Sequence, residues 1–321
     1  MVDIVPDIPK KGRGAITNRD GRHEKIRTYN IDDGWDIDIA SLTSFATSVI
    51  DERPKTIITY NQSPDLSFKR SINPYRGCEH GCIYCYARPT HAFHGLSPGL
   101  DFESKLFAKP NAAGLLEAEL RKPDYIVEPI AIGTNTDPYQ PIEKRRRIMR
   151  QILEVLEAYN HPVSITTKSA LVLRDIDILS PMSDRGLVTV AFSIATLDQN
   201  LARTLEPRAA SPQKRLGAMQ QLSDAGINTF CLAAPIIPGL NDHELERIID
   251  EAITAGASGA DYILLRLPRE TRELFTEWLE IYQPRRKSKI INMIRACRGG
   301  ALYDSDWNNR QHGTGPFSEL L

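Results

Sequence analysis

The chain has 321 residues, of which 41% are hydrophobic and 25% are charged. These fractions are close to the globular average, so they exclude a generally disordered chain. The 40 Lys and Arg residues nearly balance the 41 Asp and Glu residues, which excludes a histone-like polycation. No apolar run is long enough to cross a membrane and no signal-peptide stretch opens the chain, so we expect a cytoplasmic protein.

The chain divides by composition into three parts. Residues 1–65 are polar, contain several glycines and show no sustained hydrophobic period, which predicts an irregular N-terminal arm. Residues 66–285 carry the regular patterns of a folded α/β domain. Residues 286–321 form a predicted C-terminal extension with basic residues and paired glycines.

Short β-like runs alternate with helical runs from about Phe68 onward. The predicted strands are 70–75, 104–108, 130–133, 163–167, 187–194, 229–234 and 262–267. The predicted helices are 111–121, 142–159, 171–179, 212–225, 242–255 and 270–281, with Asn111 and Ser211 as N-caps. This alternation predicts an α/β fold, a partial parallel (β/α)6 barrel, in which functional side chains follow the carboxyl ends of the strands.

Three of the five cysteines, Cys78, Cys82 and Cys85, fall within eight residues. In a reducing compartment such a cluster is more typical of a metal site than of disulfides. A [4Fe–4S] cubane normally takes four thiolates, so three would leave one iron open to an outside ligand. The alternative is a structural zinc site completed by His80, His91 or His94.

The spacing Cys-x3-Cys-x2-Cys, after the first predicted strand and with Tyr84 before the third cysteine, resembles the radical S-adenosylmethionine (SAM) superfamily. The run from Thr136 to Glu143, TDPYQPIE, is similar to the branch related to spore photoproduct lyase, and the resemblance covers residues 71–267. It implies that the three cysteines bind a [4Fe–4S] cluster whose fourth iron holds the amine and carboxylate of SAM. An electron from a donor such as flavodoxin or ferredoxin would cleave SAM to a 5′-deoxyadenosyl radical that abstracts a substrate hydrogen.

The chain departs from that family pattern in two places. A Gly-Gly-Glu-like segment that ends the family's second strand would fall at Phe107-Ala108-Lys109-Pro110 here, which leaves recognition of the SAM amine unassigned. Spore photoproduct lyase returns a hydrogen from a cysteine between the cluster loop and mid-barrel. This chain has no cysteine between Cys85 and Cys231, which argues against simple photoproduct lyase activity.

Polar residues at predicted strand ends are candidates for binding SAM. Besides Tyr84, they are Thr134, Asn135, Thr136, Asp137, Lys168 and Ser193. Hydroxyl and carboxylate groups suit the ribose, and the Lys168 ammonium suits the methionine carboxylate. The alternatives are a turn for the run 134–137, a solvated lysine, and a buried serine hydroxyl bonded to backbone. The loop at Glu206 and Arg208 could face the substrate or form a surface ion pair.

Two strongly basic stretches, 144–150 and 285–298, are the pattern expected of nucleic-acid contact, or of solvated helix faces. The first hypothesis is therefore a radical SAM enzyme of unknown substrate, with a nucleic-acid lesion as one candidate. The second is a non-catalytic iron–sulfur or zinc protein that binds nucleic acid.

Overall fold

The computed structural model describes residues 7–24 and 46–321. Its largest element is a seven-stranded sheet with the order β10-β9-β8-β7-β6-β3-β2. Six neighbouring strands are parallel: β3 (Arg70–Ile72), β6 (Ile130–Ile132), β7 (Val163–Thr167), β8 (Val188–Ser193), β9 (Thr229–Ile236) and β10 (Ala260–Leu264). The short β2 (Thr59–Tyr60) pairs antiparallel with β3 at one edge. The α/β class and the parallel sheet are confirmed, and strand pairing in the described chain leaves the sheet open.

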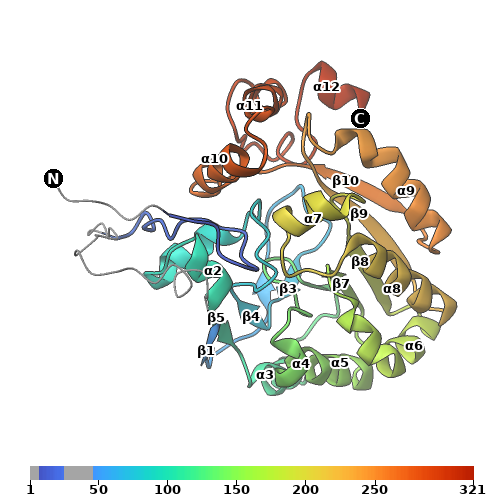
Figure 1. Cartoon of the computed structure of the whole chain (residues 1–321). Helices are drawn as coiled ribbons and strands as arrows, with labels where there is room; N and C mark the ends of the chain where they lie inside the picture. Colours follow the sequence, from blue (N-terminus) through green and yellow to red (C-terminus); the bar gives the residue numbers. More distant parts are fainter. Residues whose placement is uncertain (1–6, 25–45) are drawn as a thin grey trace.

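Helices cover the outer face of this sheet (Figure 1). In chain order the helices up to β9 are η1 (Arg88–His94), α2 (Leu100–Ser104), α3 (Ala112–Leu120), α4 (Glu143–Arg146), α5 (Ile148–Ala158), η2 (Ala170–Asp175), α6 (Ile176–Asp184), α7 (Gln199–Leu205) and α8 (Pro212–Asp224). The later ones are η3 (Asp242–Glu244), α9 (Leu245–Thr254), α10 (Thr271–Tyr282), α11 (Lys287–Ala296) and α12 (Pro316–Leu320). Helices α6, α8 and α9 pack on strands β8 to β10. Helices therefore cover the outer face of these strands, as expected for a parallel sheet.

A second, three-stranded sheet has the order β1-β5-β4, with β1 (Ser48–Asp51), β4 (Tyr75–Arg76) and β5 (Lys105–Ala108). The expectation that 104–108 is a strand of the main sheet is wrong, because β5 pairs with β1 and β4 instead. The predicted strand 70–75 is likewise divided between the two sheets. The second parallel strand is β6, so the segment that ends it begins at Gly133, and the assignment to Phe107–Pro110 is also wrong.

The ends of the predicted helices agree with the structure in some places and differ in others. The helix expected over 142–159 is broken into α4 and α5 at Arg147, whose φ of +53° is left-handed. The helix expected from 212 begins at Pro212 as predicted, and the Ser211 hydroxyl accepts the amide hydrogen of Lys214. Asn111 occupies its predicted N-cap position without a capping bond, and its side-chain amide donates to the carbonyl of Pro54. Helices η1, α2, α7, α11 and α12 were not expected.

The core lies in two main parts. One fills the space between the sheet and its covering helices and includes Ile132, Ile165, Val190 and Phe192, each with no exposed surface. The other lies between α7, α10, α11 and the cysteine loop, around Trp278. This second part joins the C-terminal helices to the domain at the site described next.

The N-terminal arm is only partly described, and the part of it at 25–45 lies outside the described residues. Within the described part, residues 12–16 are largely buried. The domain boundaries at 65 and 285 stay predictions. A search of the described chain finds no helix long and apolar enough to cross a membrane.

Candidate functional site: the cysteine loop and the strand ends beside it

The three clustered cysteines lie in the loop between β4 and η1. Gly77 and Gly81 have φ of +71° and +69°, a left-handed conformation that L side chains rarely adopt, so the two glycines let the loop curl. Cys78 and Cys82 are 7% exposed, Cys85 is partly exposed, and all three thiols are free. The loop is anchored by the amide of Cys78, which donates to Phe102. The spacing motif thus places three free thiols in one short loop, with two of them buried.

The surroundings of these sulfurs fit an iron–sulfur cluster. Burial raises the pKa of all three thiols, and for Cys78 the Asp137 carboxylate raises it further. Metal coordination supplies the positive charge that stabilises buried thiolates. Backbone amides also face two sulfurs, that of Asp137 at Cys78 and those of Ala87 and Arg88 at Cys85. Such amide contacts are the usual outer support of a cluster.

No group of three or more His, Cys, Asp or Glu side chains in the described chain converges on a single metal ion. A cubane does not need its ligands to converge on a single ion, because each thiolate binds a different iron. Of the histidines named for zinc, His91 has its Nε2 2.9 Å from the Lys105 carbonyl oxygen, and the Nδ1 of His80 lies 3.3 Å from Asp137.

A buried ion pair holds the loop from the side of α2. The Arg88 guanidinium donates to the carbonyl oxygens of Gly81 and Cys82 at 3.2 and 2.9 Å, and pairs with Glu103 at 2.5 Å. Neither Arg88 nor Glu103 has any exposed side-chain surface. The Arg88–Glu103 pair therefore fixes the cysteine loop. Removing either residue would leave its partner as an unpaired buried charge, which is strongly destabilising.

Glu103 also ties the N-terminal segment to the loop. Its carboxylate accepts the amide hydrogens of Gly14 and Ala15 at 2.9 and 2.8 Å. Gly14 packs so closely that a Cβ there would lie 1.8 Å from the Gly81 carbonyl oxygen. Ala15 joins the apolar cluster that contains Cys82. Nothing in the sequence pattern of the arm indicated this contact.

The run that ends β6 carries the TDPYQPIE motif, which binds the cysteine loop to the neighbouring strand. The Asp137 carboxylate accepts the Thr167 hydroxyl at 2.7 Å and the Lys168 amide at 2.6 Å. Burial alone would raise the pKa of Asp137, but His80 and these donors hold it below its ordinary value. The Gln140 side chain accepts the Glu79 amide at 2.9 Å and donates to the Gly77 carbonyl at 3.1 Å. Gln140 thus brackets Cys78 on both sides.

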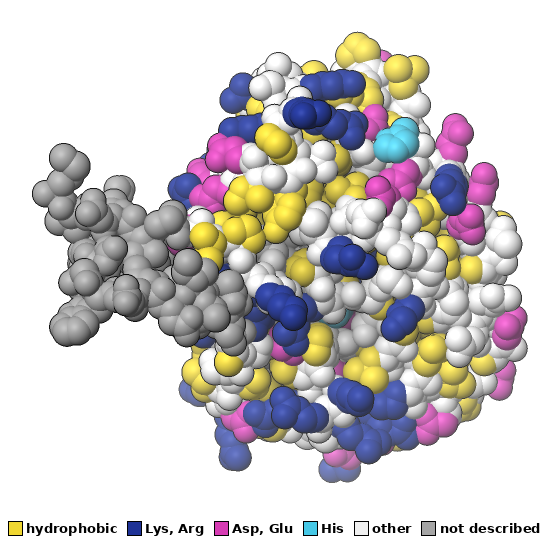
Figure 2. Space-filling model, viewed as in Figure 1, with side chains coloured by type: hydrophobic (Ala, Val, Ile, Leu, Met, Phe, Trp, Pro, Cys, Tyr) yellow, Lys and Arg dark blue, Asp and Glu magenta, His cyan; other side chains and the backbone are white. Residues whose placement is uncertain are grey.

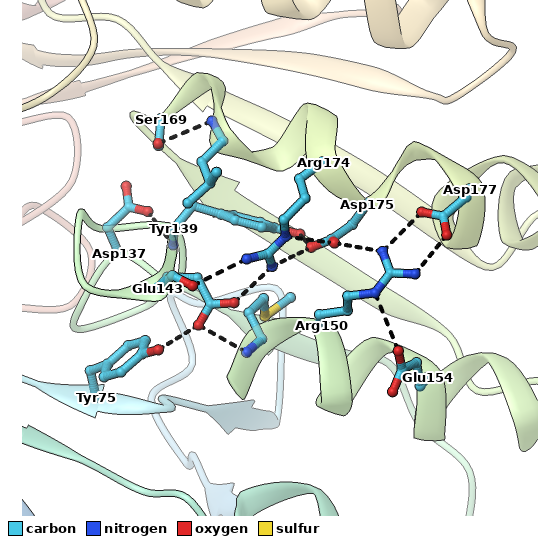
Figure 3. Close-up of polar contacts among 12 residues, drawn as sticks. Tyr75, Asp137, Tyr139, Glu143, Arg150, Glu154, Ser169, Arg174, Asp175 and Asp177 are labelled. Atoms are coloured by element: carbon cyan, nitrogen blue, oxygen red, sulfur yellow. Dashed lines mark hydrogen bonds and ion pairs between the residues drawn. The ribbon is translucent and has the colours of Figure 1, made fainter. Parts of the chain in front are cut away.

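Figure 3 shows the outer half of the same motif. The Glu143 carboxylate accepts a hydrogen bond from the Tyr75 hydroxyl and forms an ion pair with Arg174. The Tyr139 hydroxyl donates to Asp175 at 3.1 Å. Arg150 extends this network to Asp175, Asp177 and Glu154, so this member of a basic stretch is neutralised by acids (Figure 3). The TDPYQPIE motif therefore supports the cysteine loop through hydrogen bonds and ion pairs.

Three predicted SAM-binding residues meet in a second polar cluster at the ends of β7 and β8. The Lys168 ammonium lies 2.5 Å from the Ser193 hydroxyl, 3.2 Å from Glu206 and 5.7 Å from the centre of the Tyr84 ring. The Tyr84 hydroxyl donates to Glu206. We call these four residues together with Arg215 the Lys168 cluster.

Arg215 completes the cluster and was not among the residues predicted from the sequence. It is 1% exposed, pairs with Glu206, and donates to the Ser193 carbonyl at 2.7 Å. Burial alone would raise the pKa of Glu206, but Arg215 and Lys168 hold it at about 2. Lys168, Glu206 and Arg215 also act electrostatically on Cys82, so the Lys168 cluster borders the cysteine loop.

The remaining candidates, Thr134 to Thr136, lie around Asn73. The Asn73 side chain donates to the Thr134 hydroxyl at 3.1 Å and accepts the Asn135 amide at 3.0 Å. The Thr136 hydroxyl donates to the Tyr75 carbonyl, so its side chain is used internally. Thr134 is partly exposed and Asn135 is exposed. Their roles as cofactor contacts stay predictions, as do those of Asp137 and the Lys168 cluster.

Comparison with known proteins agrees with this geometry. The family model described as the radical SAM superfamily matches residues 72–252. An uncharacterized protein of Mycobacterium bovis, Mb2609c, is 38% identical over 232 residues, which are 72% of this chain and 68% of that protein. The uncharacterized protein MJ0683 of Methanocaldococcus jannaschii is 34% identical over 57% of this chain and 65% of its own.

Among solved structures, a spore photoproduct lyase mutant with bound AdoMet and dinucleoside spore photoproduct matches with a TM-score of 0.56. The two share 16% identity over 73% of this chain and 67% of that chain, which shows a common fold. The expected cofactors, a [4Fe–4S] cluster and SAM, are those of the matched family. With more than half of its length matched by the family model, the chain belongs to the radical SAM superfamily.

Proposed function

We propose that the protein is a radical SAM enzyme in which Cys78, Cys82 and Cys85 hold a [4Fe–4S] cluster. The observation that carries the proposal is one buried loop of three free thiols bordered by a charged cluster at the ends of two parallel strands. When bound and reduced, the cluster and SAM supply a 5′-deoxyadenosyl radical that abstracts a hydrogen atom from the substrate. The open parallel sheet is proposed to be the partial (β/α)6 barrel of this family.

The residues of the Lys168 cluster are proposed to bind SAM. The Lys168 ammonium is 15% exposed and has Glu206 and Ser193 as close partners, so it is held in place yet reachable by a carboxylate. Arg215 keeps the Glu206 carboxylate in place on the protein side. The hydroxyl of the partly exposed Thr134 and the amide of the exposed Asn135 suit the ribose.

The finer reaction class is proposed with one restriction. The solved relative is a lyase, and this chain has no cysteine between Cys85 and Cys231 to return a hydrogen atom as that lyase does. We therefore propose that the enzyme abstracts a hydrogen atom from its substrate and that no cysteine between Cys85 and Cys231 returns one. The electron is proposed to come from a small donor such as flavodoxin or ferredoxin.

Anaerobic reconstitution tests the proposal. It predicts about four irons and four sulfides per chain and release of 5′-deoxyadenosine from SAM that depends on dithionite. Both are lost in Cys82→Ala, whereas Cys231→Ala, a buried cysteine far along the chain, retains them. Iron binding without SAM cleavage would contradict the enzymatic proposal. A colourless protein that takes up only zinc would favour the zinc alternative.

A further inference from the structure

Two adjoining cavities form one groove over the outer side of α7. The first, of about 480 Å³, is lined by Pro9, Lys10, Lys11, Gly12, Arg13, Arg203, Thr204, Pro207 and Tyr282. The second, of about 380 Å³, lies between α7, η3 and the end of α10 and includes Arg286. Thr204 and Tyr282 line both cavities, so the two cavities adjoin at these residues. We call the two cavities together the α7 groove.

Lys10, Lys11 and Arg203 are the cations of the α7 groove that are available to a ligand. Arg13 donates to Glu103 and Thr47, Arg286 donates to the Gly239 carbonyl, and the acids of the groove are engaged. In the part of the chain that the structure describes, no hydrogen bond or ion pair is made by the side chains of Lys10, Lys11 or Arg203. The Asp198 carboxylate instead accepts the amides of Asn200 and Leu201 as the N-cap of α7. The Glu244 carboxylate accepts the Thr196 hydroxyl and the Leu197 amide. The charge left for a ligand is therefore positive.

The groove borders the site proposed for catalysis. Pro207 on its wall is the neighbour of Glu206, and Arg208, the next residue, pairs with Glu79 of the cysteine loop at 3.0 Å. The last residue of α7, Leu205, accepts the amide hydrogen of Ile83 in that loop. In Figure 2, dark-blue side chains lie around α7 and above it over α11. A long ligand in the α7 groove would thus pass beside the cysteine loop.

We propose that the α7 groove binds the phosphate backbone of a single-stranded nucleic acid. This inference rests on the function proposed above, because the bound strand would carry the substrate. Cations lie at both ends of the groove, Lys10, Lys11 and Arg203 in one cavity and Arg286 in the other, as a repeating anion requires. Tyr282, shared by both cavities, offers an aromatic ring on which a base can stack. A carboxylate peptide would use the cations but not the ring.

The test uses the full, cluster-reconstituted chain and a 5′-fluorescein-labelled twelve-residue oligothymidylate, with binding followed by fluorescence anisotropy against salt. The variant Lys10→Gln/Lys11→Gln/Arg203→Gln is expected to bind about tenfold or more weakly, and the slope of log affinity against log salt is expected to flatten by about 2. The matched control, Lys144→Gln/Arg145→Gln/Lys214→Gln, removes three exposed cations elsewhere and should bind as the unaltered protein does. Equal losses in both triple variants would overturn the proposal.

A second pair of variants isolates stacking. Tyr282→Leu should weaken binding by about tenfold, and Tyr282→Phe should retain it. Polyglutamate that displaces the oligonucleotide at equal charge concentration would indicate an acidic protein partner and overturn the proposal. So would displacement by thymidine monophosphate at equal phosphate concentration. Dithionite-dependent SAM cleavage, measured on the same samples, should be unchanged in every groove variant. Intact cleavage together with strand binding that the groove substitutions do not weaken would refute this inference and leave the proposed enzyme standing.

Discussion

The cysteine loop is supported on two sides by charged residues that are arranged very differently. On one side the Arg88–Glu103 pair has no exposed side-chain surface, and its partners are backbone groups of the loop and the N-terminal segment. On the other side Lys168 is 15% exposed, and its partners are side chains. The first arrangement suits a cluster that must stay in one place. The second suits a cofactor that must enter and leave.

The contrast teaches where stability and binding separate. Fully buried charges stabilise the fold only as a complete set, because removing one leaves its partner unpaired. A partly exposed lysine can exchange a protein partner for a ligand carboxylate at lower cost, because water still reaches it. Substitutions of Arg88 or Glu103 should therefore change folding and cluster retention, and substitutions of Lys168 should change SAM affinity.

The largest expected effect comes from Glu103→Gln. The substitution leaves the Arg88 guanidinium buried without a counter-charge, which should lower the free energy of unfolding by about 3–5 kcal/mol and reduce cluster retention. Chemical denaturation of the apo-protein measures the first effect, and iron content measures the second. Glu251→Gln, in an exposed pair with Arg247, is the control and should change neither. Equal stability of the two variants would remove the central role assigned to the Arg88–Glu103 pair.

Gly14→Ala tests the contact between the N-terminal segment and the loop. Its Cβ would meet the Gly81 carbonyl oxygen at 1.8 Å, so the segment must shift, at a cost of about 1–3 kcal/mol. Gly114→Ala, in α3 with nothing within 4 Å of the new Cβ, should instead stabilise the protein by about 0.5–1 kcal/mol. Denaturant titration compares the two variants. Effects of the same sign would mean that Gly14 does not pack against the loop as described.

The two sides also differ in how far they could be predicted from sequence. Lys168 and Ser193 directly follow or end continuous β-branched and apolar runs, and polar residues at strand ends are a local signal. Arg88 and Glu103 give no such signal, because a charged residue is ordinarily exposed and only the tertiary structure buries these two together. Arg215 was missed for the same reason, since it reads as one polar residue of the amphipathic helix α8.

The fold shows the same division. Strands β6 to β9 were predicted because each is a short, buried run between helical patterns. β5 has the same local pattern, yet it pairs with β1, which precedes it by more than fifty residues. Local sequence does not encode which strands pair, so the second sheet could not be predicted. The break at Arg147 was missed because no glycine or proline marks it.

Lys168→Gln sharpens the comparison from the side of the strand ends. Loss of the ammonium should weaken SAM binding by about tenfold, the size of one charge-assisted hydrogen bond, while iron content stays unchanged. Equilibrium dialysis with labelled SAM under anaerobic conditions measures the affinity. Lys168→Arg, which keeps the charge, should lie between the two. If Lys168→Gln lost the cluster and kept its SAM affinity, the assignment of the two sides would be reversed.

The smallest expected effect is a pH dependence within the packed side. Burial lowers the pKa of His91 to about 4, and its ring lies against Gly77, where an added Cβ would meet Cε1 at 2.9 Å. Because unfolded histidine titrates near 6.5, the unfolded chain binds more protons between these values, so stability should fall as pH drops from about 6.5 toward 4. The free energies of unfolding of the apo-protein, from denaturant titrations at pH 7.5 and 5.5, should differ by about 1 kcal/mol on this account. The difference should shrink by that amount in His91→Gln and persist in His312→Gln, an exposed control. A pH dependence unchanged in His91→Gln would show that other groups on the packed side take up the protons.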